Sequence, residues 1–358
     1  MPETDPGIDF VLDCVAQHPG NARKVLAAGI NLESAIKFAI DNEVVGELLF
    51  AIESEKLDIP DEVVRAMHIF LQQYPVPLRS VRRQTLEIAR ILNAHGVDFF
   101  IAKGVVWNVL YRDEGVVRTT KDVDVYLRKE DITSVVTMLE KQGYIRRNVS
   151  LQTSLKHLHH YDIWSPDYGI HIELHWNLAH PRHNLRFCID QAISRCASAL
   201  FDDQTVPVLS ARDAIVFLAL ELSKDSWVNL KKLIDFSRCV SAASDNDLSG
   251  AVEFARSNGC ARALSISLAL SHRIGLAERT EHTPSLRNSN GVSARLVDIC
   301  EQHFRSNRRH HSLFSRMVRG LTLAQKHDSW LARLYHIWRI IIVYRFHSWI
   351  GLRADKFW

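Results

Sequence analysis

The sequence predicts an α+β fold in which a small mixed β-sheet lies between two helical regions. Apolar residues recur at helical spacing through the first 95 residues. Between residues 96 and 205, short runs alternate apolar with polar residues, as strands with one buried face do. Helical spacing returns at about residue 206. We therefore predict an N-terminal helical region (residues 1–95), a sheet-containing core (residues 96–205) and a C-terminal helical region (residues 206–358).

The N-terminal region is expected to contain only helices. Asn31 and Asp61 are predicted N-caps, because their side chains can accept hydrogen bonds from free amides at a helix start. The longest helical pattern ends at Gly96, a residue that readily adopts the backbone conformation of a C-terminal stop. The helical patterns of this region are VLDCVAQ, LESAIKFAI, VVGELLFAI, PDEVVRAMHIFLQQ and LRSVRRQTLEIARILNAHG.

The central region begins with a strand signal, VDFFIA, which is followed at once by the turn Lys103-Gly104 and a short helical pattern, VVWNVLYR. The strictly alternating run DVDVYL predicts a second strand, and a helix from about Asp131 ends at Gly143. Farther on, HYDIW and IHIELHW flank SPDYG. Two alternating runs separated by Pro and Gly predict a β-hairpin.

The C-terminal region opens with a predicted helix whose N-cap is Ser210, with Asp213 three residues on. The chain has a formal net charge of only +3, but residues 301–358 contain eleven Lys or Arg against three Asp or Glu. Such a basic segment can attract nucleic acid, an anionic membrane or an acidic partner, although many basic helices are simply solvated. Charge alone gives affinity without specificity, so a nucleic-acid partner is not favoured.

Composition predicts an ordinary cytoplasmic protein. The chain is 47% hydrophobic and 24% charged, and its six cysteines are scattered without a CxxC pair, which indicates reduced thiols. The first residues lack the basic and apolar segments of a signal peptide. The longest apolar stretch, Trp330 to Leu352, is interrupted by Arg333, Arg339 and Arg345, which are costly at bilayer depth. We expect no membrane-spanning helix.

Asp122 and Asp124 are separated by one residue on a predicted strand, so both side chains project from the same face. Their mutual repulsion is costly without a cation, and Mg²⁺ prefers carboxylate ligands and substrate phosphates. Two such ions can activate an attacking oxygen and stabilise a leaving pyrophosphate. The pattern alone is weak, because alternating strands often expose acids to water.

Glu173 is the third candidate carboxylate. Alternation in IHIELHW places His171, Glu173 and His175 on one face of a strand, so Glu173 can complete a metal site from a neighbouring strand. A solvent-exposed hairpin acid is the alternative. Seven of the eighteen histidines fall between residues 157 and 183, but their spacing, without an accompanying cysteine, argues against a zinc site. His171 and His175 could contact substrate, or serve as hydrogen-bonded structural residues.

The spaced set of these motifs resembles the uncharacterised nucleotidyltransferase family of the DNA polymerase beta superfamily. Members carry a strand ending in Lys-Gly, a short helix ending near a Tyr, an Arg four residues before a DxD strand, and a later Glu-Leu-His-Trp-like strand. The resemblance covers about residues 31–270 and implies a polymerase-beta-like palm as the central sheet. The matching positions are Lys103-Gly104, Tyr111, Arg118, Asp122, Asp124 and Glu173-Leu174-His175-Trp176.

The resemblance also implies where the nucleotide binds. Better-known members of the superfamily have Gly-Ser or Gly-Gly at the turn, whereas this chain has Lys103-Gly104. Gly104 still permits close backbone approach at a helix N-terminus, and Lys103 can bring a positive charge to the triphosphate; a solvent-facing turn lysine is the alternative. Arg118 is expected either to bind phosphate or to neutralise Asp122.

The segment ELSKDSWVNLKKLIDF carries Lys224, Trp227, Lys231 and Asp235 at three- and four-residue spacings, which would align them along one helical face or across a bend. The family that the chain resembles has a helix-turn-helix here, with a polar residue, a Trp and a later Asp at corresponding places. The resemblance therefore implies that this segment closes over the nucleotide, with Lys224 as a nucleotide-binding residue. A packed tryptophan with surface lysines is the alternative.

The resemblance thus implies an enzyme that transfers a nucleoside monophosphate from an NTP such as ATP, with Mg²⁺, or alternatively Mn²⁺, as cofactor. Asp122, Asp124 and Glu173 are its expected catalytic metal ligands, and Glu173 or Asp124 also helps to deprotonate the acceptor. The acceptor is a small molecule, a natural-product precursor or a protein. A toxin-like enzyme that modifies RNA or protein, and a non-catalytic nucleotide- or peptide-binding scaffold, are the alternatives.

Overall fold

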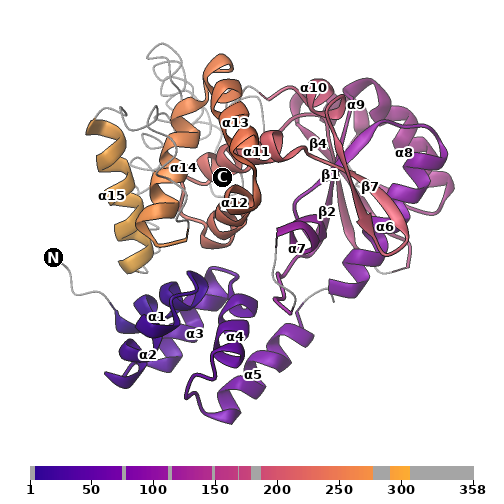
Figure 1. The fold of residues 1–358 in the computed structure, drawn as a ribbon. Coiled ribbons are helices and arrows are strands. Elements are labelled where there is room, and N and C mark those ends of the chain that lie inside the picture. The colour runs from indigo at the N-terminus through magenta and orange to yellow at the C-terminus, as the bar shows by residue number, and fades with distance from the viewer. Residues whose placement is uncertain are drawn as a thin grey trace, which may run out of the picture.

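The computed structural model describes residues 5–74, 78–111, 115–146, 150–167, 169–178, 187–276 and 291–306. In these residues helices surround a seven-stranded mixed sheet (Figure 1), so the predicted α+β fold is confirmed. No helix in these ranges is long and apolar enough to cross a membrane. The basic stretch beyond residue 306, including Trp330 to Leu352, lies outside the described residues.

Within residues 5–74 and 78–95 the N-terminal region contains helices and no strand, as predicted. The Asn31 side chain caps α3 by accepting a hydrogen bond from the Ser34 amide at 3.1 Å. The predicted cap at Asp61 is wrong: Pro60, which has no N–H to satisfy, takes the N-cap position, and Asp61 is the first helical residue. Gly96, with φ +65°, follows the last helix of this region. The helices are α1 (Pro6–Val15), α2 (Pro19–Ala27), α3 (Leu32–Asp41), α4 (Val45–Ser54), α5 (Asp61–Gln72) and α6 (Leu78–Ala94).

The sheet has the strand order β3-β4-β5-β2-β1-β7-β6. Strands β2 and β5 are parallel neighbours, as are β1 and β7, while the other neighbouring pairs are antiparallel. The predicted hairpin is therefore present as the β4–β5 pair. The strands are β1 (Phe99–Ala102), β2 (Asp122–Leu127), β3 (Ile145–Arg146), β4 (His160–Trp164), β5 (His171–His175), β6 (Ala197–Phe201) and β7 (Gln204–Val208).

The two faces of the sheet have different surroundings. Val123 and Val125 of β2 pack with α6 and α8 in one apolar cluster. Tyr126, on the opposite face, belongs to a second cluster that joins the N-terminal helices to the C-terminal ones. Its ring lies edge-on to Phe217 of α11, with centroids 5.4 Å apart. Because side chains alternate along a strand, the face that carries Tyr126 also carries Asp122 and Asp124.

The described residues that follow β7, up to residue 276 and from 291 to 306, form helices. Ser210 caps α11 as predicted, accepting a hydrogen bond from the Asp213 amide. The strands β6 and β7 and the helices α9 and α10 are not predicted from the sequence, and β7 runs across the boundary expected at residues 205–206. The remaining helices are α7 (Val105–Tyr111), η1 (Lys129–Asp131), α8 (Ile132–Lys141), α9 (Leu151–His157), α10 (Ile189–Ile193), α11 (Ala211–Lys224), α12 (Leu230–Ala242), α13 (Asp245–Ser257), α14 (Ala261–Arg273) and α15 (Gly291–Ser306).

The two helical regions meet at the far end of the molecule from the sheet. In Figure 1, α15 lies directly above α1, and an ion pair joins Arg305 to Asp9 at 2.5 Å. His18 also hydrogen-bonds the Gly275 carbonyl oxygen at 3.2 Å. The N-terminal helices therefore pack against helices of the C-terminal region.

Candidate active site

The three predicted carboxylates lie on one face of the sheet. Parallel pairing sets Asp124 opposite Glu173 and Asp122 opposite His171. Carboxylate oxygens of Asp122 and Glu173, with a nitrogen of His171, lie within 4.8 Å of one another. Strand alternation on β2 and the register of β5 thus produce the cluster that the sequence predicts.

His175 links two of these acids. Its Nε2 lies 3.0 Å from Asp124 Oδ1 and 2.9 Å from Glu173 Oε2. The imidazole is buried and stacks on the Tyr126 ring, with centroids 4.6 Å apart. Burial lowers the pKa of His175, but the hydrogen bonds to both carboxylates raise it above its ordinary value overall. The raised pKa favours the imidazolium form of His175, whose positive charge offsets part of the negative charge of Asp124 and Glu173.

The carboxylates are not equivalent. Burial raises the pKa of Asp122, and repulsion from Asp124 and Glu173 raises it further. Burial acts in the same direction on Asp124, but Lys103 and His175 bring the pKa of Asp124 below its ordinary value. Asp122 is therefore the acid whose charge is least compensated by the side chains around it.

Lys103 lies at the turn between β1 and α7, in the left-handed backbone region with φ +66°. Its Nζ is 3.6 Å from Asp124 Oδ1 and 3.1 Å from Glu221 Oε2. Its side chain is therefore inside the site, and the alternative of a solvent-facing turn lysine is wrong. Gly104 also has positive φ, +53°, and a Cβ there would lie 3.2 Å from Thr120 Oγ1. The turn thus favours glycine at this position, because any other residue would be strained there.

Glu221 of α11 is the centre of a cluster of lysines. It is only 1% exposed, and Lys224 approaches it at 2.6 Å, Lys103 at 3.1 Å and Lys232 at 3.4 Å. Lys232 also pairs with Asp225 at 2.6 Å. Burial raises the pKa of Glu221, but the three ammonium groups hold it well below its ordinary value. We call this group, Lys103, Lys224, Lys232, Glu221 and Asp225, the lysine cluster.

Sequence reasoning found only part of this cluster. Lys103 and Lys224 are predicted nucleotide-binding residues, whereas Lys232 and the buried acid Glu221 were missed. Glu221 and Lys224 are three residues apart on one helix, which is a recognisable ion-pair spacing. Lys232 reaches the same acid only because the chain reverses between α11 and α12.

Arg118 is buried and makes a two-pronged contact with Asp235 of α12. Its Nε lies 3.0 Å from both carboxylate oxygens, and its Nη2 is 2.8 Å from Oδ2. Nη1 donates to the Gly104 carbonyl oxygen at 3.4 Å. The ion pair therefore connects the Lys103-Gly104 turn to α12, and Asp235, not Asp122, is the acid that Arg118 contacts.

The predicted helix-turn-helix is present as α11, a tight turn and α12. Ser226 and Trp227 both have positive φ, +58° and +57°, which reverses the chain between the helices. Trp227 is fully buried and donates to Ser267 Oγ at 2.9 Å. Lys231 forms an ion pair with Glu43 of the N-terminal region. The tryptophan is thus a packed residue, and the lysines of this segment are ion-paired.

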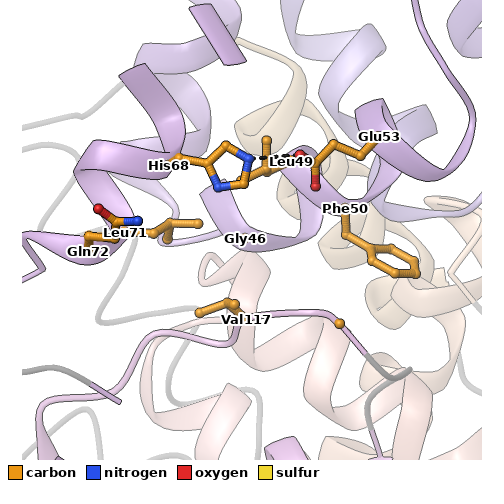
Figure 2. A pocket seen from close by; sticks show the side chains of 9 residues that line it. Gly46, Leu49, Phe50, Glu53, His68, Leu71, Gln72 and Val117 are labelled. Atoms are coloured by element: carbon orange, nitrogen blue, oxygen red, sulfur yellow. Dashed lines mark hydrogen bonds and ion pairs between the residues drawn. The ribbon is translucent and has the colours of Figure 1, made fainter. Parts of the chain in front are cut away.

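A cavity of about 220 Å³ lies elsewhere, between α4, α5 and the segment before Arg118 (Figure 2). His68 and Glu53 pair at its rim, 2.7 Å apart, and Val117 faces it from the loop. Its lining contains none of the predicted site residues. The carboxylates and the lysine cluster therefore remain the candidate active site.

One family of known proteins matches most of the chain. The family model of uncharacterised nucleotidyltransferases matches residues 28–275. No curated protein matches the chain. Among solved structures, the chain is similar to ANT(2″)-Ia in complex with adenylyl-2″-tobramycin, with 14% identity, a TM-score of 0.36, and coverage of 49% of this chain and 97% of that one.

Two further solved structures show comparable similarity. A solution structure of the antibiotic-resistance factor ANT(2″)-Ia has 14% identity and a TM-score of 0.35, covering 54% of this chain and 94% of that one. An antigenic nucleotidyltransferase-like protein from Paracoccidioides brasiliensis has 14% identity and a TM-score of 0.32, covering 51% and 91%. Similarities of this size assign neither an acceptor nor a nucleotide. The family match spans well over half of the 358 residues and includes every predicted site residue, and the chain therefore belongs to the family of uncharacterised nucleotidyltransferases.

Proposed function

We propose that this protein transfers a nucleoside monophosphate from an NTP to an acceptor hydroxyl, and that Asp122, Asp124 and Glu173 hold divalent cations for the reaction. The observation that carries the proposal is the convergence of these three carboxylates on one sheet face beside the lysine cluster. In this arrangement the three carboxylates would bind cations, and the neighbouring lysine cluster would bind an anion. A metal–triphosphate complex needs both.

The carboxylates fit a magnesium site by their chemistry. They provide oxygen donors only, as Mg²⁺ prefers, and burial together with repulsion from Asp124 and Glu173 raises the pKa of Asp122. A bound divalent cation would relieve that repulsion. When present, Mg²⁺ supplies charge neutralisation for the triphosphate and for the departing pyrophosphate.

The lysine cluster is the proposed triphosphate site. Three ammonium groups face two carboxylates, so the cluster carries one excess positive charge when all five groups are ionised. Buried Glu221 fixes the ammonium groups in position, and fixed charges lose little ordering entropy when an anion binds. Lys103 contacts both Glu221 and Asp124 and therefore lies between the phosphate and metal halves.

Arg118 has a different proposed role from the phosphate binding expected from its sequence position. Its donors face Asp235 and the Gly104 carbonyl oxygen, and its side chain is only 6% exposed. We assign it the positioning of the Lys103-Gly104 turn against α12. The phosphates are then bound by the lysine cluster.

Glu173 is the proposed proton acceptor for the incoming hydroxyl. Its side chain is 24% exposed, whereas that of Asp124 is 8% exposed, so an acceptor reaches Glu173 more readily. His175 hydrogen-bonds Glu173 and thereby orients it. Removing the hydroxyl proton makes the oxygen a better nucleophile for the α-phosphorus.

The proposal is tested with radiolabelled NTPs, Mg²⁺ and a panel of acceptors that includes hydroxyl-bearing small molecules, peptides, proteins and RNA ends. Wild type is expected to label at least one acceptor class, and the Asp122→Ala/Asp124→Ala double variant none. Asp203→Ala, which changes an exposed acid in the β6–β7 turn, is the matched control. Equal labelling by wild type and the double variant refutes the metal-site assignment.

A further inference from the structure

Three histidines gather next to the carboxylates, where β4 begins and β5 ends. Antiparallel pairing sets His160 of β4 directly opposite His175 of β5. The Trp176 amide donates to the His159 carbonyl oxygen at 3.1 Å, so the two chains stay side by side one residue beyond the strands. Strand pairing therefore places the adjacent residues His159 and His160 beside a histidine from a later part of the chain.

The imidazoles of these residues form one group. One ring nitrogen from each of His159, His160 and His175 lies within 4.8 Å of the other two. The closest pair is His159 Nε2 and His160 Nδ1, which are 3.2 Å apart. The ring centroids are 4.4 Å apart for His159 and His160, and that of His175 lies 5.8 Å and 5.2 Å from them. Three nitrogen ligands are thus available to a single ion.

Two of the three imidazoles have a carboxylate at their other ring nitrogen. His160 Nε2 lies 3.3 Å from Asp162 Oδ1. His175 Nε2 lies 3.0 Å from Asp124 Oδ1 and 2.9 Å from Glu173 Oε2. A histidine that binds a metal usually donates its second N–H to a carboxylate or carbonyl, which fixes the tautomer and the orientation of the ring. His160 and His175 have this arrangement.

The remaining nitrogen of His175 indicates a ligand. The side chain is only 3% exposed, and its Nδ1 has no hydrogen-bond partner among the described residues. A buried polar atom without a partner is costly and therefore uncommon. A hydrogen bond between His159 and His160 explains their 3.2 Å contact but leaves this atom unsatisfied. An ion bound between the three rings satisfies all three nitrogens.

The donor set selects the class of ion. Imidazole nitrogen suits Zn²⁺ and related transition metals, whereas Mg²⁺ prefers oxygen. Zinc binds imidazole nitrogen at about 2.1 Å, and the edge of a tetrahedron is about 1.6 times that length, so its ligands lie about 3.4 Å apart. The contact between His159 and His160 already has nearly this spacing, and the other nitrogens need approach by at most about 1.4 Å. Both of these histidines are partly exposed, so their rings can rotate toward an ion that enters from solvent.

We propose that His159, His160 and His175 bind a transition-metal ion of the zinc class, and that this ion holds the His175 ring with Nε2 directed at Asp124 and Glu173. The site does not depend on the proposed function. The expectation that the histidines do not bind zinc rests on their spacing along the chain, which does not reveal the pairing of β4 with β5.

Zinc binding is measured by isothermal titration of the full chain after chelation, under reducing conditions and in excess MgCl₂, which competes for oxygen ligands but not for imidazoles. Wild type is expected to bind one Zn²⁺ per chain. His159→Ala is expected to weaken binding at least about tenfold, because even the loss of a group that orients a ligand has an effect of this size. His157→Ala, which changes an exposed histidine on α9, is the matched control and should retain wild-type affinity.

Circular dichroism establishes that His159→Ala is folded, and the more conservative His159→Gln repeats the titration if it is not. Asp122→Asn is expected to bind zinc as wild type does, because Asp122 is not one of the three ligands. The proposal is overturned if wild type binds no stoichiometric zinc, if the folded His159 variant binds it equally well, or if Asp122→Asn loses it, which would place the ion at the carboxylates.

The orientation of His175 is tested by long-range ¹H–¹⁵N spectra of protein labelled in its histidines, with the His175 signals assigned by their loss in His175→Gln. With zinc bound, His175 is expected to carry its proton on Nε2 and to show a metal-bound Nδ1. A proton that remains on Nδ1 in the zinc-bound protein would overturn the proposed role of His175. If zinc binds through these residues and no acceptor is labelled, the proposed function fails and the zinc site stands.

Discussion

Replacing Asp122 with asparagine is expected to stabilise the metal-free protein while abolishing its response to Mg²⁺. Carboxylate oxygens of Asp122 and Glu173 lie within 4.8 Å, where two like charges repel by about 3 kcal/mol at an effective dielectric constant of 20 and about 1 kcal/mol at 80. Lys103 and His171 attract Asp122 and reduce the net effect. We therefore expect a gain of about 1 kcal/mol, or a rise in Tm of about 2 °C.

The assay is thermal unfolding with EDTA and with excess MgCl₂, for wild type, Asp122→Asn and the control Asp203→Asn. Wild type and the control should gain stability with Mg²⁺, because the ion binds only the folded state. In EDTA, Asp122→Asn should have a higher Tm than wild type. Adding Mg²⁺ should raise the Tm of this variant only slightly. A lower Tm of Asp122→Asn in EDTA, or an undiminished magnesium response, would refute the reasoning.

The raised pKa of the Asp122 carboxyl also predicts how stability and magnesium affinity change with pH. Because folding raises the pKa of Asp122, this group favours the folded metal-free protein at low pH, and that contribution is lost as pH rises through the folded-state pKa. Magnesium requires the ionised carboxylate, so its affinity should fall as pH is lowered through the same range. Titration calorimetry at several pH values measures this, and a magnesium affinity that rises toward acid pH would contradict it.

Three further substitutions test separate parts of the structure. Lys232→Met should weaken NTP binding about tenfold by removing a charge-assisted contact, as measured by equilibrium dialysis. Asp235→Asn should cost about 3–5 kcal/mol in urea unfolding, because it leaves the buried Arg118 guanidinium without a balancing charge. Gly46→Ala should destabilise the protein by more than about 2 kcal/mol, since its Cβ would lie 1.8 Å from the Val117 carbonyl oxygen.

Each substitution has a matched control in the same chain. Lys37→Met removes an exposed lysine of α3 and should leave NTP binding unchanged. Asp41→Asn breaks an ion pair with an exposed lysine and should cost about 1 kcal/mol or less. Gly20→Ala, in α2 with open space around its Cβ, should stabilise by up to about 1 kcal/mol. Equal effects of a test variant and its control would contradict the corresponding prediction.

The sequence alone predicts those features of the candidate site that depend on residues close together in the chain. Asp122 and Asp124 share a face because strand side chains alternate, and the Lys103-Gly104 turn follows an apolar run directly. Glu173 depends on a long-range fact, the parallel register of β2 with β5, and a one-residue slip would have turned it into the core. The family resemblance implied Glu173 as a site residue but not the strand pairing that brings it beside Asp124.

Other features could not be inferred because they depend on tertiary contacts. Arg118 and Asp235 are 117 residues apart, so neither residue's neighbours in sequence identify its partner. Lys232 reaches Glu221 through a chain reversal at the left-handed residues Ser226 and Trp227, which helical periodicity does not predict. The reversal explains the contact of Lys232 with Glu221, whereas Lys103 reaches the same acid from the turn between β1 and α7.

The β6–β7 hairpin was not predicted because its turn lacks the usual sequence signal. Its strands are joined by Asp202 and Asp203, and the first adopts φ +53°. Hairpin turns usually signal themselves through glycine or asparagine, which adopt positive φ at low cost, and this turn has neither. The run QTVPV, with its β-branched residues, is the signal that could have identified β7.

The central claim, that the site transfers a nucleoside monophosphate, is tested most directly by following the fate of each phosphate. The protein is incubated with Mg²⁺, the acceptor panel and ATP labelled at either the α- or the γ-phosphate. We predict that wild type transfers the α-label to the acceptor and releases the γ-label as pyrophosphate. The Asp122→Asn/Asp124→Asn double variant should catalyse neither the transfer nor the release. Transfer of γ-label to the acceptor, or equal α-label transfer by the double variant, would contradict the account.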